Sequence, residues 1–444
     1  MGKIYLLPLI VLFLLPVSPF TVFAQSQNTP TATVLGVEEA VKIALDYNLN
    51  LRKTQIDLAT TGYSERNLWS EIFPTINASA GITYSTPLLS ETTRTNTANT
   101  NYTMSFGLSL GLNAGIPFAM KSIQLAHQAN ILRYEEACNL LSIQVTKRYY
   151  SLIAEKNNLL LLEEVFNQAQ RQYDRNEVFF RNGFIGELAL MQSRLALENA
   201  RYNLSAANIS GVNSMAEFLS MLGLPLDSNI TLLGEINIQR ISTDAEALIR
   251  NYLPQRPDIA RSKQEIQRLE NTQRQQSMQS RAPSVNLSLN WQGSLSDPFS
   301  DSLRASATLS IPIDPWIPGT SRSQSLGRAR DSVEKAKIDL EIAENSAKTQ
   351  IRTLTSMLHN SWDSILIARL GYQTAQRSYQ LTEQGFNSGI VESLVLEDAR
   401  NNMANARQRL FQSELAYFNM ILDLSSAINI DWRDFMRTYG VPGE

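Results

Sequence analysis

The sequence predicts a mainly α-helical protein with a membrane β-barrel portion, built from a duplicated unit of helix, β-hairpin and long helix hairpin. Three observations support this fold class. The chain repeats itself in order, each copy contains two segments of alternating apolar and polar residues, and each alternating pair is followed by a long heptad pattern. Because the repeat is too long for a solenoid unit, we interpret it as a duplicated half-protein.

The duplication is visible as landmarks that recur in the same order in both halves of the chain. The aligned segments are 48–51 with 256–259, 73–79 with 282–288, and 180–185 with 386–391. We therefore expect a first structural repeat at 25–222, an equatorial linker at 223–243, a second repeat at 244–424 and an equatorial C-terminal tail at 425–444.

Residues 1–24 have the pattern of a cleavable signal peptide. Lys3 precedes an apolar run that ends at Leu15, and the segment Val22-Phe23-Ala24 has small residues where a signal peptidase reads the chain. Cleavage after Ala24 would expose Gln25 rather than a cysteine. The mature chain is therefore expected to be exported and unlipidated.

Composition and charge exclude several classes of function. A net charge of -3 without a basic block argues against nucleic acid as a partner. The single cysteine, Cys138, allows no intrachain disulfide, and His127 and His359 have no Cys, Asp or His partners at metal-ligand spacing. We therefore expect no enzyme activity, no cofactor and no metal site.

Four segments alternate with the period of a β-strand, and we expect strands at about 75–85, 103–116, 284–293 and 302–313. In each, one face is apolar and the other carries small polar residues, which suit a water-filled lumen better than an exposed surface. No later segment approaches the roughly 20 apolar residues of a membrane-spanning helix. The chain therefore crosses a membrane as strands, or the strands form one sheet of a soluble β-sandwich.

Four strands cannot close a barrel alone, and an open sheet edge in lipid leaves backbone groups unpaired. Closure by two, three or four protomers would give 8, 12 or 16 strands, and about eight strands is the practical minimum for a barrel. The connections from Ser85 to Tyr102 and from Gly293 to Asp301 are expected to be surface loops on the outside of the cell.

Long coiled-coil-like helices are expected at about 119–181, 187–222, 325–386 and 393–423. The heptad positions of the first copy are Ile131, Cys138, Val145, Leu152, Leu159, Phe166 and Tyr173, and those of the second copy are Ile351, Leu358, Ile365, Tyr372 and Tyr379. A helix of this length extends roughly 90 Å, which no compact domain requires. Shorter helices at about 37–73 and 244–279 lead to the strand pairs, with Pro74 and Pro283 after them.

The order of these parts, from about residue 35 to residue 430, resembles the outer-membrane factor family of TolC-like efflux proteins. The most specific elements are the proline-led strand openings, the Ile-Pro pairs at 116–117 and 311–312, and the pattern FNSGIVESLVLEDA at 386–399. The resemblance implies a homotrimer in the cell outer membrane, with a 12-stranded transmembrane barrel continued by a helical periplasmic tunnel. It also implies a periplasmic adaptor (membrane fusion) protein and an inner-membrane RND, MFS or ABC transporter as partners.

The resemblance further implies functional residues at the two tip turns, which we expect at Gly183 and Gly389 because glycine supplies the positive φ that reverses the chain. The apolar residues expected to dock an adaptor are Phe184, Ile185, Ile390 and Val391.

The family places acidic residues at the tunnel entrance, just past the second tip turn. Asp398 matches one such position, with Glu392 and Glu397 nearby. Val395 occupies the companion position one turn earlier, and Ala189 occupies the matching place in the first copy. Three copies of Asp398 would form a ring that attracts cations. The alternative for Glu392 and Glu397 is a solvated position on the helix surface.

Three hypotheses follow for function. The first is an outer-membrane channel-tunnel of a tripartite efflux or type I secretion system, a passive duct that exports drugs, dyes, metals or proteins delivered by its pump. The second is a non-transporting outer-membrane structural or adhesion protein with the same architecture. The third, a periplasmic hydrolase, would require clustered catalytic residues, and the sequence contains no such cluster.

Overall fold

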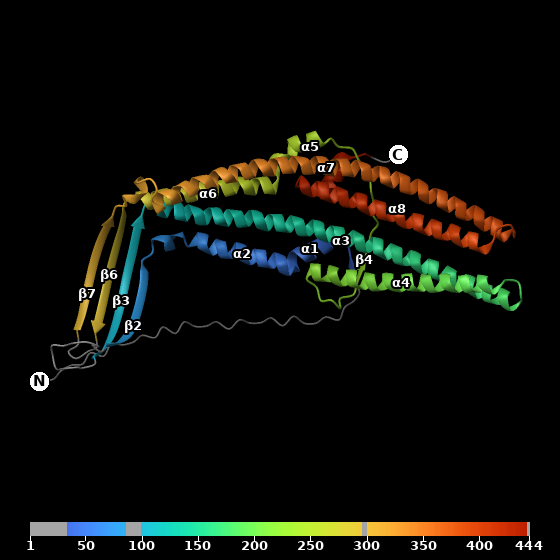
Figure 1. Ribbon diagram of the computed structural model, residues 1–444, viewed down its shortest axis with the longest axis horizontal. Coiled ribbons are helices and arrows are strands. Elements are labelled where there is room, and N and C mark those ends of the chain that lie inside the picture. The colour runs from blue at the N-terminus through green and yellow to red at the C-terminus, as the bar shows by residue number, and fades with distance from the viewer. Residues whose placement is uncertain (1–32, 86–98, 295–299, 442–444) are drawn as a thin grey trace.

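The computed structural model describes residues 33–85, 99–294 and 300–441, so the expected signal peptide and most of both expected surface loops lie outside the described residues. The molecule is elongated, with a β-sheet at one end and, at the other, two turns where long helices reverse direction (Figure 1). Long helices connect these ends, which confirms the mainly helical fold class.

The sheet contains both predicted strand pairs. Its strands are β2 (Thr75–Ser85), β3 (Asn99–Asn113), β6 (Ser284–Ser294) and β7 (Ser300–Ser310), antiparallel in the order β2-β3-β6-β7. One hairpin comes from each copy, and β3 pairs with β6 to join them. Because the other sheets of the described residues have only two strands each, no second sheet covers this one as a β-sandwich would.

The register confirms the predicted alternation, since apolar residues of all four strands share rows on one face. Ala78 is opposite Phe106, Phe106 is opposite Trp291, and Trp291 is opposite Leu303. The ring centroids of Phe106 and Trp291 lie 5.7 Å apart. The opposite face carries hydroxyl ladders, in which the Oγ atoms of Ser79 and Ser105 lie 2.7 Å apart.

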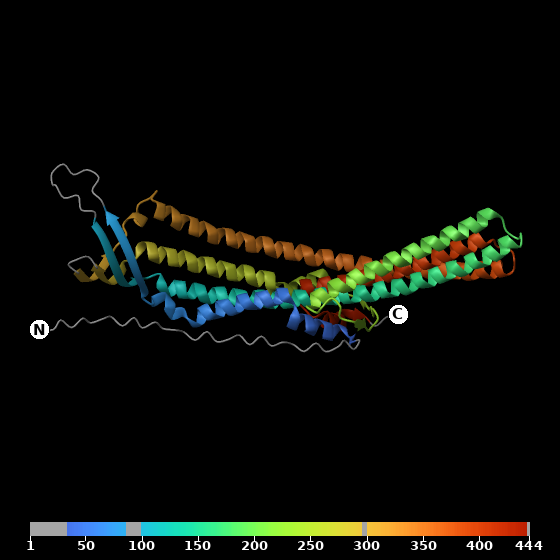
Figure 2. The same cartoon turned by 90° about the horizontal axis from the view of Figure 1, so that it is seen from below.

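Two helix hairpins extend away from the sheet. They are α3 (Ile116–Arg181) with α4 (Glu187–Leu222), and α7 (Ser321–Asn387) with α8 (Ser393–Ala427). The first and third of these helices run almost from the sheet to the tip (Figures 1 and 2). The expected helix starts at about 119 and 325 were too late, because Pro117 occupies the first turn of α3 and the Thr320 hydroxyl accepts a hydrogen bond from the backbone N–H of Ser323.

The heptad seam is buried along the middle of the molecule. Ile351, Leu358 and Ile365 of α7 are fully buried, as is Val145 of α3. Toward the tip the buried side chains of α3 become polar, with Gln172 in place of an apolar residue. The coiled-coil pattern therefore holds the hairpins together at mid-length and gives way to polar packing near the tip.

Each expected short helix is two helices in the structure. The elements are α1 (Val37–Tyr47), α2 (Leu49–Arg66), α5 (Ala245–Tyr252) and α6 (Pro257–Arg281), with single 3₁₀ turns at 68–72 and 253–255. Asn48 breaks the first because its side chain accepts hydrogen bonds from the backbone N–H groups of Asn50 and Leu51, which caps α2. Pro254 and Pro257 interrupt the second.

Two strand ends differ from the prediction. The strand expected at 103–116 is β3, which begins at Asn99 and ends at Asn113, because Pro117 starts a helix rather than ending a strand. The strand expected to end at residue 313 ends at Ser310, and a 3₁₀ turn at Asp314–Trp316 follows it.

Two hydrophobic cores, one for each copy, form where short elements pack against the long helices. Besides α1 and α5, the short elements around them are β1 (Thr33–Leu35), β4 (Ile230–Leu232), β5 (Arg240–Ile241), α9 (Trp432–Tyr439) and β8 (Gly440–Val441). Of these short elements, α1, β4 and α5 lie near the middle of the long axis (Figure 1). Two tyrosine hydroxyls join the long helices to these short elements. Tyr149 of α3 donates to the carbonyl of Leu35 in β1 at 2.8 Å, and Tyr417 of α8 donates to the carbonyl of Gln239, just before β5, at 2.9 Å.

Candidate functional site

The first tip turn closes α3 with a Schellman motif. Gly183 has φ +75°, its N–H donates to the carbonyl of Phe180 at 3.0 Å, and the N–H of Phe184 donates to the carbonyl of Phe179 at 2.8 Å. The rings of Phe179 and Phe184 meet edge to face with centroids 6.2 Å apart. The sequence folds this way because only glycine takes a left-handed conformation without a steric penalty.

The second tip turn uses the same backbone geometry with a different side-chain contact. Gly389 has φ +76°, and the N–H of Ile390 donates to the carbonyl of Gly385 at 2.9 Å. No aromatic pair is available here, and Val391 lies against Gly385 instead, where an added Cβ would be 2.7 Å from Cγ2 of Val391. Close packing of Val391 therefore depends on the absence of a side chain at Gly385.

The four expected docking residues fall into two groups. Phe184 and Ile390 are among the most exposed apolar side chains of the described residues, at 75% and 82% exposure. Ile185 and Val391 are half-buried at the bases of the turns. Each turn therefore presents one apolar side chain to solvent and uses the other residue to pack the loop.

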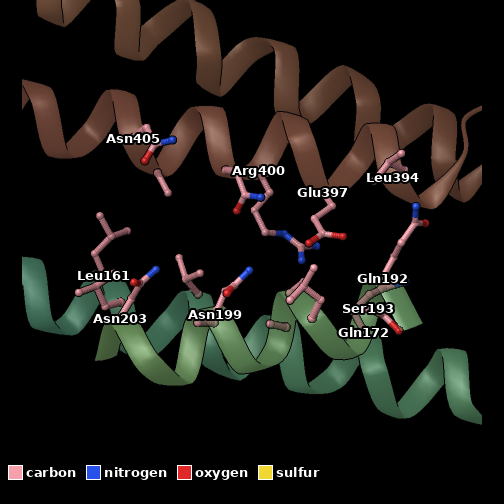
Figure 3. A pocket seen from close by; sticks show the side chains of 18 of the residues that line it. Leu161, Gln172, Gln192, Ser193, Asn199, Asn203, Leu394, Glu397, Arg400 and Asn405 are labelled. Carbon is pink, nitrogen blue, oxygen red and sulfur yellow. The ribbon is translucent and has the colours of Figure 1, made fainter. Parts of the chain in front are cut away.

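A groove of about 490 Å³ runs between the two hairpins behind the tip. Figure 3 shows side chains of α8 facing those of α3 and α4 across it. Its lining is mixed. The apolar members are Leu161, Leu162, Val165, Ala169, Leu195, Ala196, Ala200, Leu394 and Ala404, the neutral polar members are Gln172, Gln192, Ser193, Asn199, Asn203, Asn401, Asn405 and Gln408, and the charged members are Glu397 and Arg400. A groove of this composition offers hydrogen-bonding groups beside apolar surface.

Glu397 and Arg400 give the groove its electrostatics. Burial raises the pKa of the Glu397 carboxyl; Arg400 opposes this effect, and the negative charge of Asp398 adds to it. Arg400 also lies over the ring of Tyr379, with its guanidinium carbon 6.0 Å from the ring centroid. The Nε atom of Arg400 is buried without a hydrogen-bond partner among the described residues.

The three expected acidic gate residues do not form one cluster. Glu397 is half-buried and points into the groove (Figure 3), whereas Asp398 and Glu392 are exposed. Asp398 is not part of the groove lining, because one residue along a helix turns the side chain by about 100°. The structure therefore separates Glu397 from Asp398, and the gate role of Asp398 stays a prediction.

The groove itself was not predicted from the sequence. A signal was present, since amides recur on one face of each helix at spacings of three, four or seven residues, at 192, 199 and 203 and again at 401, 405 and 408. Such a stripe beside an apolar heptad seam is typical of a helix face that meets another polar helix or water.

The described residues contain no group of three His, Cys, Asp or Glu side chains that could hold a metal ion. Among the described helices, none combines the length and the apolar character needed to cross a membrane. The arrangement at the tip can bind a partner or admit water.

Comparison with known proteins adds a family match over most of the chain. The family model described as "Outer membrane efflux protein" matches residues 40–224 and 248–429. A toluene efflux pump outer membrane protein of Pseudomonas putida, TtgC, is 24% identical over 417 residues, which cover 89% of this chain and 83% of TtgC. The antibiotic efflux pump outer membrane protein ArpC of Pseudomonas putida matches with the same identity and coverage.

Solved structures of outer membrane channels share the fold. The CmeC channel of Campylobacter jejuni superposes with a TM-score of 0.72 at 18% identity, over 91% of this chain and 89% of CmeC. The open state of the MtrE channel of Neisseria gonorrhoeae gives a TM-score of 0.69 at 14% identity, over 89% of each chain. At these identities the likeness establishes the fold alone.

Proposed function

The chain belongs to the outer membrane efflux protein family, and on this premise we propose that it is the channel-tunnel of a tripartite efflux or type I secretion system. In this role it is a passive duct in the cell outer membrane. An inner-membrane RND, MFS or ABC transporter, joined through a periplasmic adaptor protein, delivers cargo to its helical end. The predicted signal peptide would direct the chain across the inner membrane.

The observation that carries this proposal is the four-stranded sheet with one apolar face and two open edges. The outer edges of β2 and β7 have no strand partner among the described residues. In lipid, each unpaired backbone group costs several kcal/mol, so the edges require partners from other copies. Three copies would place β7 of one beside β2 of the next and close twelve strands, the homotrimer that the family resemblance implies.

Aromatic residues support the placement of the sheet in a membrane. Trp69, just before β2, is 55% exposed, and Trp316, just after β7, is 64% exposed. Both lie beyond the ends of the strands that are next to the helices, not along the unpaired sides of β2 and β7. Tryptophan is enriched at membrane–water interfaces, and barrels carry aromatic girdles there. This end of the sheet therefore fits the periplasmic surface of the outer membrane.

The helical part fits a tunnel through the periplasm. At 1.5 Å per residue, the 67 residues of α7 extend roughly 100 Å. The exposed apolar side chains of Phe184 and Ile390 stand at its far end, where an adaptor would dock. Loss of such isolated apolar contacts would weaken an interface without disturbing the two hydrophobic cores.

The class of cargo follows from the relatives rather than from a binding pocket. TtgC and ArpC are named for toluene and antibiotic efflux. We propose that this chain likewise exports small drugs or solvents, with selection made by the pump and not by the duct.

The test is affinity capture of the tagged chain from cross-linked, detergent-solubilised envelopes, with mass spectrometry of the partners and the native mass of the captured core. We expect a trimer with an adaptor and a proton-driven pump. Capture of an ATP-driven exporter would leave protein secretion open as the role of the duct. A monomer without pump components would overturn the proposal and favour the structural or adhesion hypothesis.

Matched variants would locate the docking surface in the same experiment. Ile390→Ser and Phe184→Ser should retain the trimer and lose the adaptor. Leu226→Ser, at a 66% exposed apolar residue of the equatorial linker, should retain both. Adaptor capture by both tip variants at the level of the control would place docking elsewhere.

A further inference from the structure

The polar face of the four-stranded sheet carries a single charged residue. At the other polar-face positions of β2, β3, β6 and β7 the sequence has Ser, Thr, Asn, Gln or Gly. The exception is Arg304, in the middle of β7, which is exposed. Its place on this face is fixed by the next polar position, since the Oγ atoms of Ser306 and Ser288 lie 2.7 Å apart.

No carboxylate neutralises Arg304 among the described residues of this face. Its row across the sheet consists of Asn290 directly opposite, then Gly107, then Asn77. Asp301 is the other charged residue of β7, but it lies an odd number of positions away and belongs to the opposite face, opposite Gly293. Arg304 takes part in no ion pair within the described part of the chain. A guanidinium also keeps its charge at every physiological pH.

We propose that Arg304 is the charge-selectivity determinant of the barrel and favours the passage of anions over cations. This inference rests on the proposed function, because it requires the polar face to line a lumen shared by three copies. Three symmetry-related guanidinium groups would then form one ring at a single depth. Rings of Arg or Lys favour anions in pores, as rings of Asp or Glu favour cations.

The strength of the effect follows from screened electrostatics. The Debye length is about 10 Å at 0.1 M salt, about 30 Å at 0.01 M and about 3 Å at 1 M. For three charges on the order of 10 Å from the axis in a water-filled lumen, the anion-to-cation permeability ratio should change about fivefold at 0.1 M, about twentyfold at 0.01 M and hardly at 1 M. A salt dependence of this form separates a charge effect from a change in pore shape.

The experiment measures reversal potentials of the purified full-length protein in planar lipid bilayers under a KCl gradient. Arg304→Gln should lose the anion preference of the wild type, Arg304→Glu should reverse it, and Arg304→Lys should retain it. Asn290→Asp leaves Arg304 in place and sets a carboxylate opposite it. This variant should lose the preference as Arg304→Gln does, whereas Asn290→Gln is its neutral control.

Each outcome bears on a separate claim. If the wild type forms no channel, the proposed function fails. If the wild type conducts and Arg304→Gln has the same permeability ratio at 0.01 M, the inference about Arg304 is wrong and the proposed function stands. Should Arg304→Gln fail to insert, Asn290→Asp decides, since unchanged selectivity of that variant against Asn290→Gln would equally overturn the inference.

Discussion

Substitutions at four glycines are expected to distinguish the function of the tip turns from the folding of the hydrophobic cores. Gly183→Val and Gly389→Val place a β-branched residue at φ +75° and +76°. An added Cβ at either position meets no atom within 4 Å, so the penalty comes from the backbone alone. A left-handed conformation costs an L-residue about 1–2 kcal/mol, and a β-branched residue tolerates it least. The strain falls on a turn that no core residue contacts, so the barrel should still insert.

Gly223 should respond differently, although its φ of +74° is nearly the same. There an added Cβ would lie 2.2 Å from the carbonyl oxygen of Tyr47 and 2.6 Å from its carbonyl carbon. Backbone atoms cannot rotate away as a side chain can, so Gly223→Ala must displace the junction of α1 and α2 beside the first core. Gly211→Ala is the opposite control, since Gly211 lies inside α4 with open space around it, and alanine should stabilise the helix by about 0.5–1 kcal/mol.

Two measurements distinguish these outcomes in a deletion strain complemented with each variant. The heat stability of the outer-membrane oligomer on semi-native gels reports folding, and accumulation of an exported dye reports pump coupling. The tip variants should keep the oligomer and accumulate dye, Gly223→Ala should lose the oligomer, and Gly211→Ala should behave as wild type or better. Normal export by both tip variants would refute the assignment of these turns, and an oligomer of Gly223→Ala as stable as that of Gly211→Ala would refute the steric argument.

Three further predictions concern charged residues. Asp398→Lys should change ion selectivity, or block by multivalent cations, in planar bilayers; unchanged behaviour would place Asp398 outside the constriction. Because burial raises the pKa of Glu397, against the opposing effect of Arg400, the folded state retains this proton more tightly, and stability falls as pH rises from about 4.3 through the folded pKa. Glu397→Gln should therefore raise the thermal midpoint at pH 7 and leave it unchanged near pH 4; equal effects at both pH values would contradict this. Arg256 is 8% exposed and donates to the carbonyl of Ala427 at 2.8 Å. Arg256→Met should therefore lower the free energy of unfolding by about 2–4 kcal/mol in denaturant titrations. A loss under about 0.5 kcal/mol would show that the contact is dispensable.

The sheet could be predicted from the sequence because a period of two is a strong local signal. Nine residues from Ile76 to Tyr84 alternate without exception, and the pairing of Ala78 with Phe106 and of Phe106 with Trp291 follows once one face must be apolar. The strand ends were less predictable. Proline ends a strand and also begins a helix, and the two Ile-Pro pairs take these two different roles, with Pro117 in the first turn of α3 and Pro312 just beyond β7.

The breaks in the short helices follow from local signals that the hydrophobic pattern does not contain: side-chain capping by Asn48 in the first, and Pro254 and Pro257 in the second. Asn48 and Arg256 were recognised as aligned positions of the two copies, and both are N-cap residues in the structure, of α2 and α6. Three residues later, Leu51 and Ile259 are both buried. Asn48 also donates its side-chain amide to the carbonyl of Met221 at 2.7 Å, a contact between distant segments that no local pattern could specify.

The candidate site was predictable in position but not in orientation. The positions of the tip glycines could be predicted because they come after long uninterrupted helices. Which face of α8 packs against α7 could not be predicted from its sequence. Leu394, Val395 and Leu396 are apolar on three successive positions, so periodicity cannot say which side meets α7. Packing decides it: Leu396 is buried and Val395 is exposed, which turns Glu397 into the groove and leaves Asp398 outside it.

The two tips also show how a duplicated fold acquires unequal ends. Both keep the same backbone hydrogen bonds, which satisfy the last carbonyl groups of a long helix. These bonds require only a residue that can take the left-handed conformation, whatever the neighbouring side chains are. The side-chain contact that accompanies them was free to diverge, to an aromatic pair of Phe179 and Phe184 in one copy and to Val391 against Gly385 in the other. An aromatic pair restrains Phe184, whereas Ile390 is free of such a contact and is the more exposed of the two. A partner that grips both tips therefore meets one restrained and one unrestrained apolar side chain per protomer, and Ile390→Ser should weaken its binding at least as much as Phe184→Ser.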